Sequence, residues 1–215
     1  MLPNQLSTLP SQRGLLLVVS GPSAVGKDTV LDALLSSTNL PHPILKCVTA
    51  TTRDPRPTET DGVDYFFLSA PRFHEMVAAG EFIEYAEVHG FWYGTPRTWV
   101  EERLRTGVDV ILKIDVQGAL SVSHQFDDAI LVFLQPPSLE ELERRLRQRR
   151  SDNSDAIARR LLNARSEMAR RGDYDYAITN DEVDLAVDGI RAIIIAEHAR
   201  IRKAPESVRK VNSDG

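Results

Sequence analysis

The chain has 215 residues, a formal net charge of −5, and 42% hydrophobic and 27% charged residues. This composition is ordinary for a globular protein, and the acidic balance argues against non-specific binding to nucleic acid or to an anionic membrane. No apolar stretch approaches the ~20 residues of a membrane span, and residues 1–13 lack the apolar centre of a signal peptide. The single cysteine, Cys47, excludes an internal disulfide and favours a reducing compartment such as the cytoplasm.

The most informative stretch of the sequence is a glycine-rich loop with the order Gly21, Pro22, Ser23, Ala24, Val25, Gly26, Lys27, Asp28, Thr29. It follows the apolar run 14–20, which predicts a buried strand, and it precedes 30–35, where apolar residues have helical spacing. In this context the glycines let backbone N–H groups converge on an anion, and the helix N-terminus adds a partial positive charge. We therefore predict a phosphate-binding loop, with Lys27 reaching the outer phosphates; the alternative is a chance turn.

The residue after the lysine departs from the usual loop pattern. A hydroxyl for Mg²⁺ is expected there, and the sequence has Asp28, with Thr29 one place later. A carboxylate is a hard oxygen ligand that binds Mg²⁺ directly or through water. We therefore expect Asp28 to contribute to a Mg²⁺ site.

Two arginines follow the next predicted strand. Residues 44–49 predict that strand, and the prolines within 50–57 predict an extended loop that carries Arg53 and Arg56. Arginine is suited to bidentate capture of a phosphate. The alternative, two solvated surface arginines, stays open at this point.

Short strands at 64–68 and 82–88, a short helix at 71–79 and an aromatic turn at 91–96 suggest a subdomain inserted into an α/β chain. This region carries an unusual polar set, namely Thr49, Arg53, Arg56, Tyr65, Glu84, Tyr93 and Thr95. Arginines and tyrosine hydroxyls suit a phosphate, and a carboxylate such as Glu84 suits a base edge with two N–H donors, as guanine has. Taken singly, each aromatic is more often a core residue than a ligand contact.

The apolar strand predicted at 108–115 ends on Asp115. In open α/β sheets the carboxyl ends of the strands face the ligand crevice, so Asp115 is a candidate for a nucleotide or metal site. A further buried strand is predicted at 129–134, and a last strand at 176–179 precedes a closing helix at 185–201.

Two arginine-rich helices are predicted at 139–150 and 155–168. One interpretation is a mobile flap that brings arginines onto a polyphosphate during group transfer. The other is a solvated, charged helical hairpin. The excess of arginine over lysine favours the flap.

From residue 14 to about 201, the order and spacing of these motifs resemble the guanylate kinase family of P-loop nucleoside monophosphate kinases. Besides the loop, the resemblance is carried by Thr51-Thr52-Arg53-x-Pro-Arg56, Asp64-Tyr65, Phe82-Ile83-Glu84-Tyr85, Tyr93-Gly94-Thr95, Ile114-Asp115-Val116-Gln117-Gly118, Pro136-Pro137-Ser138, Arg160-Leu161 and Asn180-Asp181.

The resemblance implies an α/β fold in three parts. These are a P-loop NTPase core with a five-stranded parallel sheet (14–48, 97–137 and 178–202), an inserted mixed α+β GMP-binding subdomain (49–96) and a helical lid (138–177). Residues 1–13, which are polar and contain prolines, and residues 203–215 are expected to be flexible tails. It also implies the reaction ATP + GMP ⇌ ADP + GDP with Mg²⁺, dGMP as a second acceptor, and a role in purine nucleotide metabolism and GMP recycling. ATP and GMP are the expected partners, with no nucleic acid or membrane, in a monomer or homodimer.

Site residues carry over from the family position by position. The GMP phosphate should be held by Arg53, Arg56, Tyr65 and Tyr93. The guanine should be read by Glu84 and Thr49, with Thr95 also in the GMP site. Asp115 should lie near the guanine or in the site between the two nucleotides. The ATP phosphates should lie on the loop from Gly21 to Thr29, and Asn180 should contact the adenine region. The residues expected to act in catalysis are Lys27, Arg53 and the lid arginines Arg145, Arg149 and Arg160.

The sequence departs from the common family pattern at several positions. Ala24 replaces a common glycine, Asp28 replaces the hydroxyl, and Thr49 stands where many members have serine. Lys113 stands where a carboxylate is common, and Arg150 where a glycine often ends the lid helix. Asp28 and Lys113 together indicate a rearranged charge balance at the metal.

Two other functions were weighed against the kinase. A non-catalytic guanylate-kinase-like binding module is disfavoured, because Lys27 and the lid arginines are retained. A related kinase acting on a ribose phosphate is disfavoured, because Glu84 and Thr49 are intact.

Overall fold

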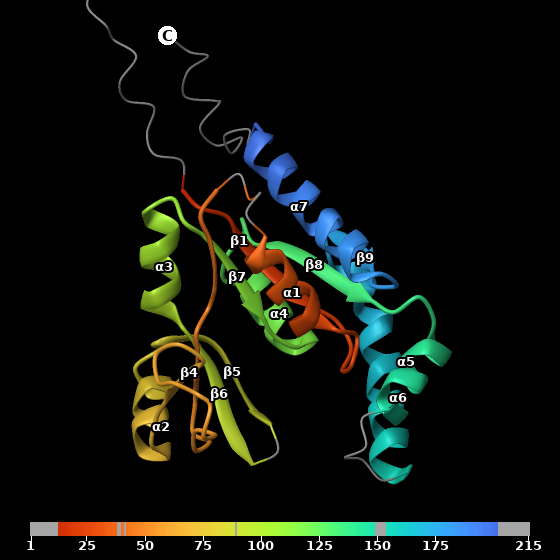
Figure 1. The fold of residues 1–215 in the computed structure, drawn as a ribbon. Coiled ribbons are helices and arrows are strands. Elements are labelled where there is room, and N and C mark those ends of the chain that lie inside the picture. Colours follow the sequence, from red (N-terminus) through yellow and green to blue (C-terminus); the bar gives the residue numbers. More distant parts are fainter. Residues whose placement is uncertain (1–12, 38–39, 41, 89, 149–153, 202–215) are drawn as a thin grey trace, which may run out of the picture.

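The computed structural model describes residues 13–37, 40, 42–88, 90–148 and 154–201, and two sheets organise it (Figure 1). The larger sheet has five strands, all parallel, in the order β2-β7-β1-β8-β9. Its strands are β2 (Ile44–Lys46), β7 (Asp109–Lys113), β1 (Leu16–Ser20), β8 (Ile130–Gln135) and β9 (Tyr176–Thr179). The predicted α/β class with a five-stranded parallel sheet is therefore confirmed.

Helices cover both faces of this sheet, as a parallel sheet requires. On one face lie α1 (Lys27–Ser36) and α7 (Val183–Ala199), and on the other α3 (Arg97–Arg105) and α4 (Val116–Ser123). Central strand β1 alternates between the two cores, since Leu17 packs with the first pair of helices and Val18 with the second. Among the described residues no helix is long and apolar enough to cross a membrane.

The second sheet has four strands in the order β4-β3-β6-β5, all drawn from residues 49–96. They are β4 (Tyr65–Phe67), β3 (Thr49–Thr51), β6 (Phe91–Pro96) and β5 (Phe82–Val88). The sheet is mixed, because β3 and β4 run parallel while β6 is antiparallel to both neighbours. Helix α2 (Ala70–Ala78) packs on it through Phe73, whose ring stacks on that of Phe82 at 4.5 Å between centroids.

The single strand predicted at 44–49 is wrong, because the structure divides it. Residues 44–46 join the large sheet beside β7, whereas Thr49 begins β3 in the second sheet. Between them the backbone N–H of Cys47 donates to the Ile111 carbonyl at 2.8 Å. Burial raises the pKa of the Cys47 thiol to about 12, so Cys47 is a packed residue rather than a reactive thiolate.

The aromatic turn predicted at 91–96 is also wrong, because this stretch forms β6. Its aromatic and β-branched residues suit a pleated surface, and it pairs with β5 through Tyr85–Gly94 and Glu87–Trp92. Gly94 is needed there, because a Cβ at this position would lie 2.8 Å from the Phe82 ring. The chain therefore reverses before residue 91 rather than within the aromatic run.

The arginine-rich region forms α5 (Leu139–Gln148) and α6 (Ser154–Ala169), followed by a short 3-10 helix, η1 (Arg170–Asp173). The two helices share a small core that includes Leu142, Leu146 and Ile157, and Ala24 of the glycine-rich loop packs against it. Because β9 begins at Tyr176, the last two residues of the expected lid, 138–177, lie in the large sheet.

Candidate functional site

The glycine-rich loop leaves β1 at the carboxyl edge of the large sheet. Gly21 has a φ of 140°, and a Cβ there would lie 2.0 Å from the Leu134 carbonyl oxygen, so only glycine fits. Gly26 has a φ of 98° and immediately precedes α1. Ala24 has a φ of 65° and is the one non-glycine residue with a positive φ among the described residues. The loop is thus bent by its glycines and strained at one alanine.

The Lys27 ammonium lies folded against this loop. Its Nζ donates to the carbonyl oxygens of Gly21 at 2.5 Å and of Pro22 at 3.2 Å. Burial lowers the pKa of Lys27 to about 8. An anion beside the loop would favour the charged form, so a phosphate group is a natural partner for this side chain.

Two side chains hold the loop in place by donating hydrogen bonds to the Val25 carbonyl oxygen. The Asn180 amide Nδ2 lies 2.8 Å from it and Arg145 Nη1 lies 3.4 Å away. Arg145 also donates through Nη2 to the Asn180 carbonyl oxygen at 3.1 Å. Asn180, which was expected to contact the adenine region, therefore contacts the backbone of the loop. Arg145, which was expected at the transferring phosphoryl group, contacts the same backbone from the base of the lid.

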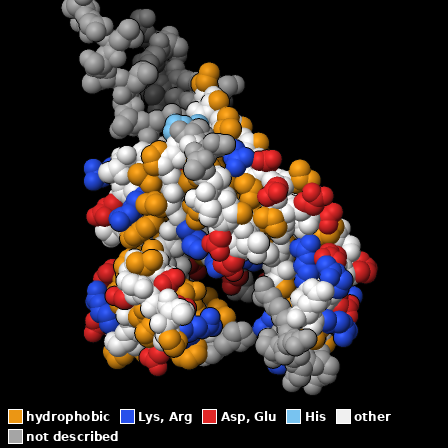
Figure 2. Space-filling view, in the orientation of Figure 1, with side chains coloured by type: hydrophobic (Ala, Val, Ile, Leu, Met, Phe, Trp, Pro, Cys, Tyr) orange, Lys and Arg blue, Asp and Glu red, His pale blue; other side chains and the backbone are white. Residues whose placement is uncertain are grey.

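A cavity of about 310 Å³ joins the loop to the second sheet. The loop contributes three of its lining residues, Gly21, Ser23 and Lys27. The second sheet contributes a polar group of residues, Thr49, Tyr65, Glu84 and Tyr93, and the carboxyl edge of the large sheet contributes Lys113 and Asp115. Figure 2 shows the molecule hollowed between the small subdomain and the lid, with many Lys and Arg side chains on the lid side. Residues predicted from distant parts of the sequence thus share one space.

Glu84 lies in β5 at the subdomain wall of this cavity. Its Oε1 accepts a hydrogen bond from Thr95 Oγ1 at 2.5 Å, and Thr95 is 1% exposed. Burial raises the pKa of Glu84 to about 7, although the Thr95 hydroxyl opposes this rise. The other oxygen is confined too, because a Cβ at Gly118 would lie 3.0 Å from Oε2. A half-buried carboxylate fixed in this way is suited to accept from N–H donors of a planar ligand.

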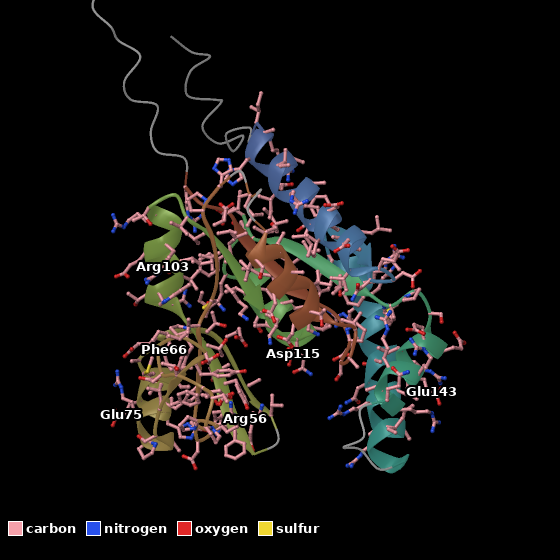
Figure 3. All side chains as sticks on the ribbon, in the orientation of Figure 1. Arg56, Phe66, Glu75, Arg103, Asp115 and Glu143 are labelled. Atoms are coloured by element: carbon pink, nitrogen blue, oxygen red, sulfur yellow. The ribbon has the colours of Figure 1, made fainter. Side chains whose placement is uncertain are left out.

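The arginines of the insertion differ in how they are held. Arg53 donates through Nη2 to Glu59 at 2.9 Å and its guanidinium lies 5.4 Å from the centre of the Tyr65 ring. The Tyr65 and Tyr93 rings lie 6.1 Å apart, so Arg53 and both tyrosines form one group. Arg56 is exposed, and Figure 3 shows it on the small subdomain. The hydrogen bond from Arg53 to Glu59 raises the pKa of Arg53, which stays charged.

The residues considered for a metal lie at the carboxyl edge of the large sheet. Asp28 forms an ion pair with Lys113; burial disfavours the charged form of Asp28, but Lys113 outweighs this and lowers its pKa. Asp115 caps α4, with its Oδ1 accepting from the Gly118 N–H at 2.8 Å, and Figure 3 labels it at this edge. Within the described ranges no group of three His, Cys, Asp or Glu side chains could hold a metal by itself.

The remaining predicted residues lie around the cavity or outside the described part. Thr29 is exposed in the first turn of α1, and Arg160 is half-buried on α6. Arg149 lies outside the described residues. One cavity residue, Glu167 on α6, was not predicted. A signal was present, because an acidic side chain in the last turn of a helix is disfavoured by the helix dipole.

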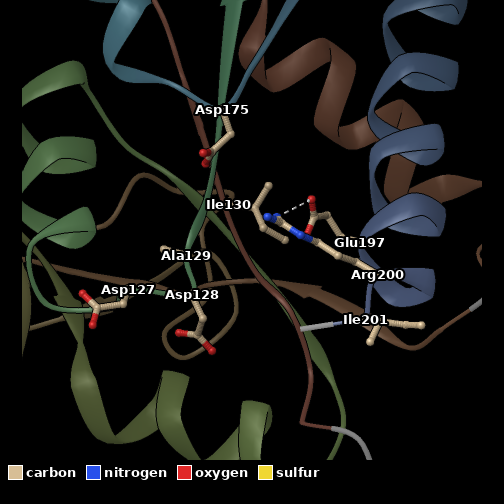
Figure 4. A pocket seen from close by; sticks show the side chains of 8 residues that line it. All are labelled: Asp127, Asp128, Ala129, Ile130, Asp175, Glu197, Arg200 and Ile201. Carbon is tan, nitrogen blue, oxygen red and sulfur yellow. Dashed lines mark hydrogen bonds and ion pairs between the residues drawn. The ribbon is translucent and has the colours of Figure 1, made fainter. Parts of the chain in front are cut away.

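A larger hollow, of about 670 Å³, lies at the amino ends of β8 and β9 (Figure 4). Four carboxylates line it, from Asp127, Asp128, Asp175 and Glu197. Glu197 pairs with Arg200 at 3.3 Å. This hollow shares no lining residue with the loop cavity, and its acidic lining disfavours anions. The loop cavity is therefore the candidate site.

Comparison with known proteins points to the same site. The family model described as guanylate kinase matches residues 13–197. The guanylate kinase of Streptococcus thermophilus is 47% identical over 204 residues, which cover 95% of this chain and 97% of that protein. The chain belongs to the guanylate kinase family. The resemblance inferred from the sequence is thereby confirmed, as is the prediction of a nucleoside monophosphate kinase.

Two further family members show how far the similarity extends. The guanylate kinase of Streptococcus pyogenes serotype M3 is 48% identical over 193 residues, covering 90% of each protein. The crystal structure of guanylate kinase from Anaplasma phagocytophilum superposes with a TM-score of 0.70 at 34% identity and covers 88% of this chain and 89% of that one. The family's fold thus extends over the core, the insertion and the lid.

Proposed function

We propose that this guanylate kinase transfers the terminal phosphoryl group of ATP to GMP, and also to dGMP, giving ADP and the nucleoside diphosphate. The observation that carries the proposal is the shared cavity, which has the phosphate loop with Lys27 on one wall and Glu84 with Thr49 on the other. Donor and acceptor nucleotides would then meet above the carboxyl edge of the large sheet. This is where open α/β sheets bind ligands.

On the acceptor side, different residues would bind the base and the phosphate of GMP. Glu84, fixed by Thr95 at 2.5 Å, would accept from the two N–H donors on the guanine edge, with Thr49 beside it. Arg53, Arg56, Tyr65 and Tyr93 would hold the GMP phosphate. Adenine presents a different edge, with one amino donor beside a ring acceptor, so the same carboxylate would disfavour AMP.

The donor side rests on the loop from Gly21 to Thr29. Its backbone N–H groups and Lys27 would bind the ATP phosphates, while Asn180 and Arg145 hold the loop in shape through the Val25 carbonyl. Phosphoryl transfer needs alignment, exclusion of water and charge neutralisation rather than a protein nucleophile. Arg160 and Arg149 on the lid, together with Arg145, would supply positive charge on closure.

Mg²⁺ is expected to accompany ATP, and the residues present fit it. Mg²⁺ is usually held by one or two carboxylates, waters and substrate phosphates, and Asp28 and Asp115 offer such oxygens beside the cavity. Bound there, the ion would neutralise phosphate charge. We propose Asp28 as the contributing side chain, in competition with its ion pair to Lys113.

A coupled assay of ADP release tests the proposal. With ATP and Mg²⁺ fixed, GMP, dGMP, AMP and a ribose bisphosphate are offered in turn. Rapid turnover with GMP and dGMP alone is the expected result. A binding module would turn over none of them, and preference for the ribose bisphosphate would indicate the related kinase class.

The setting of this activity is proposed from the sequence. The lone cysteine is consistent with a reducing compartment such as the cytoplasm, where free nucleotides are the substrates. A monomer or a homodimer is expected, and sedimentation at several protein concentrations distinguishes the two.

A further inference from the structure

Glu167 is an acidic side chain inside a site that must bind anions. It stands in the last turn of α6 and lines the loop cavity together with Ser23 and Lys27. The end of a helix carries partial negative charge, so this carboxylate gains nothing from its own helix. Any stabilisation of its charge must therefore come from the loop that it faces.

Glu167 lies where an anion bound to the phosphate loop would lie, because it lines the cavity beside Ser23 and Lys27. Burial raises the pKa of the Glu167 carboxylate, while the Lys27 ammonium and the Ser23 backbone N–H oppose this rise. The second oxygen, Oε2, is fully buried and has no hydrogen-bond partner among the described residues. A buried oxygen without a donor is costly. The loop therefore attracts this carboxylate, but one of its two oxygens has no hydrogen-bond donor among the described residues.

We propose that Glu167 is an internal stand-in for a nucleotide phosphate, occupying the anion-binding side of the loop in the nucleotide-free protein and leaving it when ATP or ADP binds. This inference rests on the proposed function, because it takes the loop as the seat of the ATP phosphates. A phosphate group presents more charged oxygens to the same donors, so it displaces the carboxylate. Nucleotide affinity is lowered by whatever fraction of molecules has the loop occupied.

The displacement is linked to the lid because Glu167 is part of it. Arg160 stands seven residues before Glu167 on α6, and this spacing places both on one face of the helix, about 10 Å apart along its axis. Movement of α6 that withdraws Glu167 from the loop changes which part of this face lies over the cavity. A movement of α6 that withdraws Glu167 would therefore also move Arg160.

The test is calorimetric titration of the full chain with ADP, in the absence of GMP, for the wild type and Glu167→Gln. If the stand-in occupies the loop about nine-tenths of the time, the variant binds ADP about tenfold tighter. The matched control is Glu143→Gln, which makes the same charge change on the outer side of the lid, where Glu143 pairs with Arg147 at 2.6 Å (Figure 3). Its ADP affinity should stay within about twofold of the wild type.

Each titration is run with Mg²⁺ and with EDTA, because the two arms separate the stand-in from a metal role. Tighter binding by Glu167→Gln in both arms supports the proposal. Unchanged or weaker binding overturns it, and weakening confined to the Mg²⁺ arm assigns Glu167 to the metal instead. A wild-type chain that binds no ADP overturns the proposed function as well.

A second readout detects the carboxylate at the loop directly. In the nucleotide-free wild type, the Ser23 amide resonance should shift with pH as Glu167 titrates, and the shift should vanish in Glu167→Gln. The charged groups that face Glu167 are Lys27, Asp115 and Arg170. Asp115→Asn should retain the titration, whereas its loss in that variant would assign the signal to Asp115 and overturn the contact.

Discussion

The Thr95 hydroxyl donates a hydrogen bond of 2.5 Å to Oε1 of Glu84, which fixes a half-buried carboxylate at the wall of the nucleotide cavity. Burial raises the pKa of this carboxylate to about 7, and the Thr95 hydroxyl restrains the rise. Because only the ionised carboxylate accepts from both guanine N–H donors, the charge state of Glu84 governs base recognition.

GMP affinity should therefore fall as the pH falls through 7. With a pKa of about 7, the ionised fraction drops from about nine-tenths at pH 8 to about one-tenth at pH 6, so GMP binding should weaken about tenfold. Thr95→Val should move this profile to higher pH, because it removes the hydrogen bond that lowers the pKa. Calorimetric titration with GMP measures both, and Glu84→Gln reports the contribution from titration of the GMP phosphate. A wild-type profile identical to that of Glu84→Gln would contradict the role of Glu84.

The ion pair between Asp28 and Lys113 predicts that substitutions of these two residues have opposite effects on the Mg²⁺ concentration that the kinase needs. If Asp28 helps hold the ion, Asp28→Asn should raise the half-saturating Mg²⁺ concentration several-fold, and Lys113→Gln should lower it by freeing the carboxylate. Kinase assays over a range of Mg²⁺ at fixed ATP measure this. The matched controls are Asp188→Asn and Arg191→Gln, an ion pair on α7 at 2.5 Å that lines neither the main cavity nor the pocket beside Asp28. Unchanged Mg²⁺ dependence in Asp28→Asn would end the hypothesis.

Removal of the loop lysine should abolish most of the activity without unfolding the protein. Lys27→Ala should lower kcat by about 10²–10³-fold, the usual cost of losing one preorganised charge at a reacting group. The substitution removes two hydrogen bonds to loop carbonyls, but Asn180 and Arg145 still hold the loop through the Val25 carbonyl, so the loop backbone should remain folded. Steady-state kinetics and circular dichroism measure the two effects. Arg105→Ala, at an exposed site on α3, is the control, and near-normal activity in Lys27→Ala would refute the assignment.

The strained alanine in the loop predicts a stabilising substitution. Ala24 has a φ of 65°, a region that costs a residue with a Cβ about 1 kcal/mol or more and glycine almost nothing. Ala24→Gly should thus raise the free energy of unfolding by about 0.5–1 kcal/mol, despite the extra freedom of the unfolded chain. Urea denaturation measures it. Ala192→Gly, at an exposed site inside α7, should instead lose about 1 kcal/mol. Equal losses in both would show that the strain is absent.

Local patterns in the sequence predicted the parts of the fold whose partners lie close by. The strand, loop and helix around Lys27 follow one another directly, and both the hydrophobic periods and the glycines agree there. The divided strand at 44–51 was not predictable in this way. Ile44 and Thr49 are equally extended, and only distant partners, Asp109 and Tyr65, assign them to different sheets.

Prediction of the candidate site from local sequence was limited in the same way. Glu84 was predictable from residue chemistry and from the family, but its hydrogen bond to Thr95 depends on how β5 and β6 pair. The aromatic run at 91–96 resembled a turn because Gly94 and Pro96 are turn formers, whereas Gly94 is in fact required by the Phe82 ring. Glu167 escaped prediction because the residues beside it in the cavity, Ser23 and Lys27, are far away in the chain.

The Val25 carbonyl oxygen receives hydrogen bonds from Asn180 and from Arg145, so one backbone atom connects the loop, the end of β9 and the first lid helix. It follows that the loss of either hydrogen bond would weaken the binding of the donor nucleotide by the loop. A compound that draws Arg145 away from the Val25 carbonyl would therefore disturb the loop without mimicking a nucleotide.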